Sequence, residues 1–303
     1  MTDYARDKYL KFMRKLTAII CLVLIFAQKQ LPCAADNNSA KTGTVSYTNT
    51  PRYISLAPST TEILFALGLD EEIVGVSTYC NYPQAAKSKT KVGDFSQPSM
   101  ETIISLHPDY IFGTGLEQAP VISELKRIFP NVYVADPATI DELFKTINDI
   151  GRITNRTKEA KELLRDMFED IETINALVKN IPQDKKVKVF VEIWHEPLMT
   201  AGKGSFVDEL ITMAGGINVA HDVARPFCNY SSEKVISLDP ECIILTYMDK
   251  AAPLKLLESR FGWKNITAVK NKRVFNDIDP DILLRPGPRI TEGLKEIFKR
   301  LYP

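Results

Sequence analysis

A sixteen-residue pattern occurs twice in this chain. Residues 99–114 read S-M-E-T-I-I-S-L-H-P-D-Y-I-F-G-T, and residues 231–246 read S-S-E-K-V-I-S-L-D-P-E-C-I-I-L-T. In each copy a serine is followed by a glutamate, which is typical of a helix start, because serine caps free N–H groups and glutamate favours the positive end of the helix dipole. Each helix must end before Pro108 or Pro240, since the residue before a proline avoids the α conformation. Both copies therefore predict a short, capped helix.

A buried strand is predicted after the helix in each copy. The apolar runs Tyr110–Phe112 and Cys242–Leu245 have the length and composition of strands in the interior of a sheet. A helix–strand unit that recurs at this distance predicts two similar α/β lobes. It also places Glu101 and Glu233 at equivalent positions, one in each lobe.

A long helix is predicted between the two lobes. The segments around each repeat alternate between strand and helix patterns, which implies mainly parallel sheets covered on both faces. Residues 157–181 contain no Gly or Pro and carry apolar residues at helical spacing until Pro182. We therefore predict an α/β protein with two Rossmann-like lobes joined by one long, rigid α-helix. The predicted boundaries are 36–154 for the N-terminal lobe, 155–181 for the connecting helix and 182–303 for the C-terminal lobe.

The N-terminus has the order of regions found in a secretory signal peptide. A basic stretch precedes the apolar run 16–27, and a polar stretch and the small residues Cys33, Ala34 and Ala35 follow it. The apolar run is too short to predict a transmembrane helix. We predict a signal peptide over residues 1–35 and an exported protein of the periplasm or cell envelope. A lipid anchor on Cys33 is the alternative that we do not favour, because Pro32 fits a lipidation motif poorly.

The composition argues against several classes of partner. Lys and Arg together number 38, as do Asp and Glu, so the chain has no net charge that would favour nucleic acid or an anionic membrane. The chain has three histidines, which is few for a histidine-rich metal site. Cys242 falls in an apolar strand and is predicted to be an inert core thiol. Cys80 and Cys228 lie in predicted loops, and the sequence leaves open whether they pair.

No catalytic motif stands out in the sequence. It contains no G-x-S-x-G, G-x-x-x-x-G-K-[ST] or H-E-x-x-H pattern. A tetrapyrrole chelatase or related enzyme would need a base and metal ligands in the cleft, which only His195 and Glu196 would supply. An isolated histidine in a loop more often has no such role. We therefore predict that the protein is not an enzyme.

Several aromatic and polar residues fall in predicted loops at the ends of strands, where open α/β sheets bind their ligands. Two aromatic loops that face each other across a cleft describe a site for a large, flat, partly apolar ligand. The candidate ligand-binding residues are Tyr79 and Phe95 in the first lobe, Trp194, Met199 and Phe227 in the second, and Asp281 and Arg285 near the C-terminus.

Four stretches resemble the periplasmic cobalamin-binding proteins of ABC importers. They are Y-I-S-L-A-P-S-T-T-E-I-L-F-A-L-G (53–68), V-G-V-S-T-Y-C-N-Y-P (74–83), V-G-D-F-S-Q-P-S-M-E-T-I (92–103) and R-P-G-P-R-I (285–290). The similarity extends from Arg52 to the C-terminus. These proteins belong to the helical-backbone class of substrate-binding proteins, which also includes ferric-siderophore and haem binders. The resemblance implies two lobes joined by one rigid helix, in agreement with the helix predicted above.

The resemblance also implies roles for individual residues. Tyr79 matches a tyrosine that contacts the corrin, and Phe95 and Phe227 match the aromatic walls of the first and second lobes. The best-known members have Trp at both wall positions, so this chain departs from them there. Met199 matches an aromatic position, and Asp281 matches a polar contact near the C-terminus.

The resemblance further implies a membrane partner, because Glu101 and Glu233 match two acids that pair with arginines of the permease. We therefore predict a monomeric, exported solute-binding protein that captures cobalamin or a related corrinoid and delivers it to an ABC permease dimer. It would need no cofactor of its own. A haem or ferric-siderophore binder is the nearest alternative. Tyr79, His195 and Met199 are candidate axial ligands for haem.

Overall fold

The computed structural model describes residues 50–115, 118–247 and 253–303. The predicted signal peptide and Cys33 lie outside the described residues. Within these three segments, no helix is both long enough and apolar enough to cross a membrane.

The first sheet consists of β1 (Tyr53–Ser55), β2 (Ile73–Val76), β3 (Tyr110–Gly113) and β4 (Val132–Val134). All neighbouring strands are parallel, in the order β2-β1-β3-β4. Successive side chains of a strand point to opposite faces, so Tyr53 and Ile54 belong to different hydrophobic clusters. The helices of this lobe are α2 (Pro58–Ala66), η1 (Gln84–Ser88), α3 (Met100–Ser105), α4 (Ala119–Ile128) and α5 (Ile140–Ile153).

The second sheet consists of β5 (Lys188–His195), β6 (Leu198–Ala201), β7 (Ile217–Asn218), β8 (Phe227–Asn229), β9 (Cys242–Leu245) and β10 (Val274–Phe275). The strands β7, β5, β9 and β10 pair in parallel, in that order. This arrangement repeats the order β2-β1-β3-β4 of the first sheet. The second sheet is nevertheless mixed, because β6 pairs antiparallel with β5, and β8 pairs antiparallel with β6.

The second lobe also carries a series of short helices and the C-terminal helix. These are η2 (Gln183–Lys185), α7 (Phe206–Met213), α8 (Ser232–Leu238), α9 (Pro253–Ser259), η3 (Trp263–Asn265), α10 (Thr267–Lys270), α11 (Asp281–Leu284) and α12 (Ile290–Leu301).

The repeated sequence pattern forms the same structure in both lobes, since α3 leads into β3 and α8 leads into β9. The predicted caps are present in both copies. Ser99 Oγ accepts the Thr102 N–H at 3.2 Å, and Ser231 Oγ accepts the Lys234 N–H, also at 3.2 Å. The prediction of two similar α/β lobes with mainly parallel strands is confirmed.

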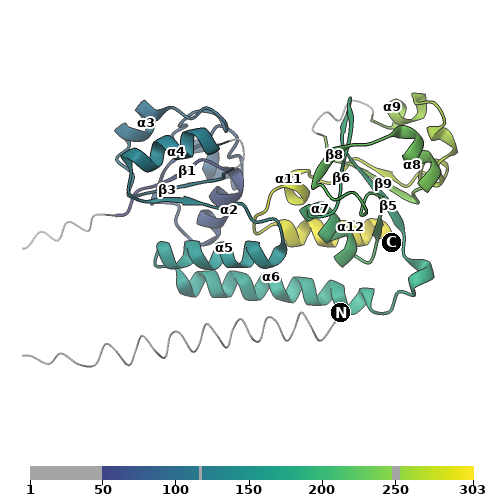
Figure 1. Cartoon of the computed structure of the whole chain (residues 1–303). Helices are drawn as coiled ribbons and strands as arrows, with labels where there is room; N and C mark the ends of the chain where they lie inside the picture. The colour runs from purple at the N-terminus through teal and green to yellow at the C-terminus, as the bar shows by residue number, and fades with distance from the viewer. Residues whose placement is uncertain (1–49, 116–117, 248–252) are drawn as a thin grey trace, which may run out of the picture. The chain divides into compact units, whose positions relative to one another are not determined.

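The connecting helix α6 spans Thr157–Val178 and is about 33 Å long at 1.5 Å per residue. It contacts α5 as well as α12 and α7 of the second lobe (Figure 1). The sequence pattern extended the helix to Ile181, which is wrong by one turn. Ile181 precedes Pro182 and cannot easily remain helical, so the N–H groups of Asn180 and Ile181 form i→i−3 hydrogen bonds in place of helical ones. The lobe boundaries proposed above remain predictions.

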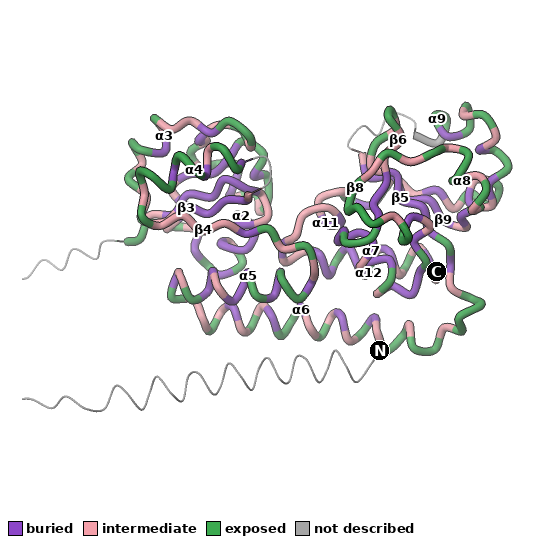
Figure 2. Tube along the Cα trace, in the orientation of Figure 1, coloured by how far each residue is buried: buried purple, intermediate pink, exposed green. Residues whose placement is uncertain are grey.

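Figure 2 shows which segments of the chain are buried. Among the described residues, three hydrophobic clusters stabilise this arrangement. One lies on the outer face of the first sheet and contains Ile54 and Ile111, and another lies on the outer face of the second sheet and contains Phe190 and Trp263. The third and largest runs from the first lobe through the buried stripe of α5 and α6 into α7 and α12. The two lobes therefore share one hydrophobic core along α6.

Candidate ligand-binding site

A cavity of about 840 Å³ lies between the two lobes. The first lobe contributes the segments that follow the carboxyl ends of β1, β3 and β4, together with Tyr79 and Phe95. The second lobe contributes the start of α7 and of β8, and the segment 283–286 adds the end of α11. Carboxyl ends of parallel strands are the usual ligand edge of an open sheet. Most of the described lining is apolar, and its charged members are Asp136 and Arg285.

The structure brings together four of the seven predicted ligand-binding residues. Tyr79, Phe95, Phe227 and Arg285 line the cavity. The other three, Trp194, Met199 and Asp281, are not part of its lining.

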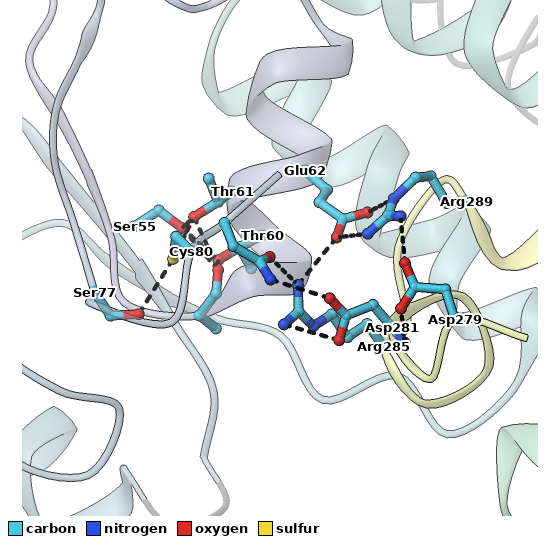
Figure 3. Close-up of polar contacts among 12 residues, drawn as sticks. Ser55, Thr60, Thr61, Glu62, Ser77, Cys80, Asp279, Asp281, Arg285 and Arg289 are labelled. Carbon is cyan, nitrogen blue, oxygen red and sulfur yellow. Dashed lines mark hydrogen bonds and ion pairs between the residues drawn. The ribbon is translucent and has the colours of Figure 1, made fainter. Parts of the chain in front are cut away.

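Tyr79 is held beside the cavity by the buried residue that follows it, Cys80. Cys80 is buried, and its Sγ lies 3.0 Å from Thr61 Oγ1 of α2 and 3.2 Å from Ser77 Oγ (Figure 3). Thr61 Oγ1 also lies 2.8 Å from Ser55 Oγ, at the end of β1. This buried group of hydroxyls and thiol fixes the loop under Tyr79, whose own side chain stays 57% exposed. The phenol is therefore available to a ligand.

Phe95 sits at the tip of a tight loop whose base is closed by Gly93 and Pro98, which form an isolated bridge. Gly93 has φ +107°, and an added Cβ would approach Pro98 Cα to 2.8 Å, so only glycine fits there. The fully buried Gln118 fastens the loop to the sheet. Its Nε2 donates to the carbonyls of Phe95 and Leu56, each at 2.8 Å, and its Oε1 accepts the Thr114 N–H at 2.9 Å.

Phe227 forms the facing wall from the second lobe. It begins β8 and pairs with Ala201 of β6, so its position depends on antiparallel strands that the described part of the first lobe lacks. Its side chain is 49% exposed and lines the cavity beside Pro226. Gly202 allows close approach of the two segments, because a Cβ there would come within 2.5 Å of the Arg225 carbonyl oxygen.

Arg285 and Arg289 reach from the C-terminal segment to the first lobe. Arg289 forms a bidentate pair with the buried Glu62 of α2, at 2.9 and 2.7 Å (Figure 3). The guanidinium of Arg289 also stacks over the Tyr82 ring at 3.8 Å. Arg285 lies 2.9 Å from Asp281 and donates to Asn81 at 2.6 Å. Asp281 therefore contacts the cavity-lining arginine, although it does not itself line the cavity.

Trp194 and Met199 lie on the β5–β6 hairpin, where they face each other in register. Trp194 packs against His195 with a centroid distance of 5.1 Å, and His195 packs against Tyr247 at 5.6 Å. His195 Nδ1 is buried and has no hydrogen-bond partner in the described part of the chain. No carboxylate orients this imidazole there, so the arrangement lacks the support that a general base or metal ligand usually has.

Glu101 and Glu233 are both exposed in the first turns of α3 and α8. The Ser231 hydroxyl donates to Glu233 at 2.6 Å and lowers the pKa of that carboxyl. A groove of about 520 Å³ beside Glu233 is lined in part by Ile236 and by Phe261, which is 99% exposed. The two acids thus occupy equivalent, solvent-facing places in the two lobes.

Cys80, Cys228 and Cys242 are free thiols. Burial raises the pKa of the Cys242 thiol to about 12, which fits an inert core residue. Across the three described segments, no group of three or more His, Cys, Asp or Glu side chains could hold a metal ion.

Sequence reasoning did not identify Asp136, Gln118 or Glu62 as part of the site. Asp136 follows β4 and could have been found from its place at the carboxyl end of a strand. Gln118 and Glu62 act through partners far away in the sequence, so no local pattern marks them.

The sequence of this chain matches the periplasmic binding protein family over residues 54–280. The chain is 36% identical over 257 residues to the uncharacterized ABC transporter substrate-binding lipoprotein YvrC of Bacillus subtilis, covering 83% of this chain and 80% of that protein. It is 27% identical over 248 residues to the vitamin B12-binding protein of Vibrio parahaemolyticus, covering 81% of this chain and 87% of the relative.

Two solved structures show the same fold over nearly their whole length. A possible iron-binding, periplasmic solute-binding protein from Staphylococcus epidermidis is 35% identical with a TM-score of 0.73, covering 83% of this chain and 98% of that one. The periplasmic haem-binding protein RhuT from Roseiflexus is 26% identical with a TM-score of 0.73, covering 84% and 98%. Family membership confirms the prediction that the protein is not an enzyme. The chain belongs to the periplasmic binding protein family and is the exported, solute-binding component of an ABC importer.

Proposed function

We propose that this protein captures cobalamin or a related corrinoid and delivers it to an ABC permease dimer. The observation that carries the proposal is the pair of aromatic walls, since Phe95 of one lobe and Phe227 of the other line a single cavity. A corrinoid is a large macrocycle with apolar faces, which such walls can cover. The relatives named vitamin B12-binding proteins, which match most of the chain, support the same ligand class.

The polar groups of the cavity suit the amides at the edge of a corrinoid. The Asp136 carboxylate accepts the Gly115 N–H at 2.7 Å and remains exposed, so it can accept further N–H groups from a ligand. On the donor side, α2 begins beside the cavity at Pro58, and its N-cap residue Ala57 provides no side-chain cap. The free N–H groups of that first turn can donate to amide carbonyls.

A haem or iron-chelate binder is the second candidate. The half-exposed Tyr79 phenol in the cavity favours it, because a phenolate oxygen can serve as an axial ligand of ferric haem. The similar structures from Staphylococcus epidermidis and Roseiflexus, named as iron- and haem-binding proteins, support this second reading.

Spectrophotometric titration of the purified mature protein separates the candidates. Cyanocobalamin, ferric protoporphyrin and a ferric siderophore are added in parallel, and their absorption bands are followed together with protein fluorescence. The proposal expects saturable, stoichiometric binding of cyanocobalamin with the tightest dissociation constant of the three. Tighter binding of ferric protoporphyrin, with the absorption-band shifts of tyrosinate ligation, would show that the ligand is haem and not a corrinoid.

For delivery, we propose that Glu101 and Glu233 meet basic residues on the two halves of the permease. Their exposure and equivalent positions support this docking, as does the apolar groove beside Glu233. We also propose that the protein acts as a monomer. Its signal peptide would be cleaved after Ala35, and a lipid on Cys33, suggested by the lipoprotein relative, is the alternative. The mass of the mature N-terminus measures which of the two forms is made.

A further inference from the structure

We infer that Asp281 and Glu62 select the charge of the ligand, because they neutralise the cavity-lining Arg285. The cavity would then favour a macrocycle whose edge carries amides over one whose edge carries carboxylates. This inference rests on the proposed function, since it specifies the ligand class of the same site.

Arg285 lies where it could bind an anionic ligand, but its guanidinium is already paired with side chains of the protein. Its side chain is 15% exposed and lines the cavity. Its Nη2 lies 2.9 Å from Asp281 Oδ1, while its Nη1 donates to Asn81 Oδ1 at 2.6 Å and lies 3.6 Å from Glu62 Oε1. Asn81 also donates to Asp281 at 3.2 Å and so holds that carboxylate in place. Both ends of the guanidinium therefore face protein acceptors.

The neighbouring arginine adds no free charge to the cavity. Arg289 is paired with Glu62 and lies 3.7 Å from Asp279. Within this cluster two cations face three carboxylates (Figure 3). Glu62 is 2% exposed and Asp281 13%, so solvent screens these pairs much less than surface ion pairs. A ligand carboxylate that enters the cavity would therefore find the positive charge of Arg285 already neutralised by protein carboxylates.

The other charged side chain of the lining leads to the same preference. Asp136 is an acid and repels a ligand carboxylate. The N–H groups at the start of α2 can donate to an amide carbonyl or to a carboxylate, so the preference rests on the charged side chains. In the described lining, no uncompensated cation therefore offsets the charge of an anionic ligand.

A matched pair of ligands tests this preference directly. Cyanocobalamin is compared with its peripheral monocarboxylate, in which one edge amide has been hydrolysed, by titration of the same protein sample. The measured quantity is the ratio of the two dissociation constants, because partial unfolding of a variant affects both equally. The wild type should bind the amide form more tightly. Asp281→Asn, which keeps the shape of the side chain but removes its charge, should shift the ratio roughly tenfold toward the carboxylate at low ionic strength.

Further variants distinguish the charge of Arg285 from a general structural effect. The shift should disappear in the double variant Asp281→Asn, Arg285→Gln, and it should shrink as salt is added. Asp279→Asn should give a smaller shift, because its partner Arg289 does not line the cavity. Asp166→Asn, which removes one partner of an exposed Asp–Arg pair on α6, should leave the ratio unchanged.

The outcomes separate this inference from the proposed function. Equal binding of the two corrinoids by the wild type, or an unchanged ratio in Asp281→Asn, would overturn the inference. The proposal that the protein carries a corrinoid would still stand. If no corrinoid binds, the proposed function falls, and the same ratio is measured with ferric protoporphyrin and its dimethyl ester. A wild type that prefers the free dicarboxylate through Arg285 would then overturn the inference as well.

Discussion

Replacing Phe227 by Ala gives the sharpest test of the two-walled cavity. The side chain is 49% exposed in the structure. A buried Phe removes roughly 200 Å² from water, so about 100 Å² of this ring is left for a ligand to cover. At about 25 cal/mol per Å² that contact contributes about 2.5 kcal/mol, or roughly 60-fold in affinity. Because the ring is half exposed without ligand, the variant should lose little stability.

The assay is isothermal titration with cyanocobalamin, alongside a thermal melt of each variant. Leu177→Ala is the matched control, since Leu177 is 47% exposed but lies on α6. Trp194→Ala tests the sequence prediction for a residue that is 46% exposed but outside the cavity lining, and it should change affinity by less than threefold. An affinity of Phe227→Ala within threefold of the wild type, with a normal melt, would refute the proposed walls.

Three further predictions follow from the lobes and their charges. Ligand binding should change the radius of gyration in small-angle scattering by no more than a few per cent, because α6 and the Glu62–Arg289 pair tie the lobes together; a clear compaction would contradict this. Burial raises the pKa of Glu209, so its ionised form lowers stability above that pKa. Glu209→Gln should therefore raise the melting temperature at pH 7, and the gain should vanish below about pH 4.5; a constant difference across this range would exclude titration as its cause. The double variant Glu101→Arg, Glu233→Arg should keep its affinity for cyanocobalamin but lose transport in reconstituted vesicles, whereas normal transport would leave both glutamates as helix-start residues only.

Local sequence patterns predict the repeated parts of the fold well. The serine caps at Ser99 and Ser231 and the following apolar runs are short-range features, and each forms the expected helix or strand. The uninterrupted apolar spacing likewise predicts α6, apart from its last turn. The antiparallel strands β6 and β8 are not predictable in this way, because their pairing depends on a hairpin that has no counterpart among the described residues of the first lobe.

The site is less predictable than the fold because its contacts join distant parts of the chain. Gln118 donates to the Phe95 carbonyl, 23 residues away, and to the Leu56 carbonyl, 62 residues away, and a single glutamine carries no periodic signal. The Glu62–Arg289 pair spans 227 residues. Trp194 illustrates the reverse case. It was expected in the cleft as an aromatic residue near a strand end, but β5 continues to His195 and places it on the hairpin.

The shared core along α6 also bears on how the chain folds. Residues 50–303 group into one compact unit, and the largest hydrophobic cluster contains side chains of both sheets. A fragment that ends after α5 would expose the surface on which Ala160 and Leu164 pack, and a fragment that begins at β5 would leave the contact surface of α12 uncovered. We therefore expect that neither lobe folds stably on its own. Heating should melt residues 50–303 in one cooperative transition, so a destabilising substitution in either lobe lowers the stability of both.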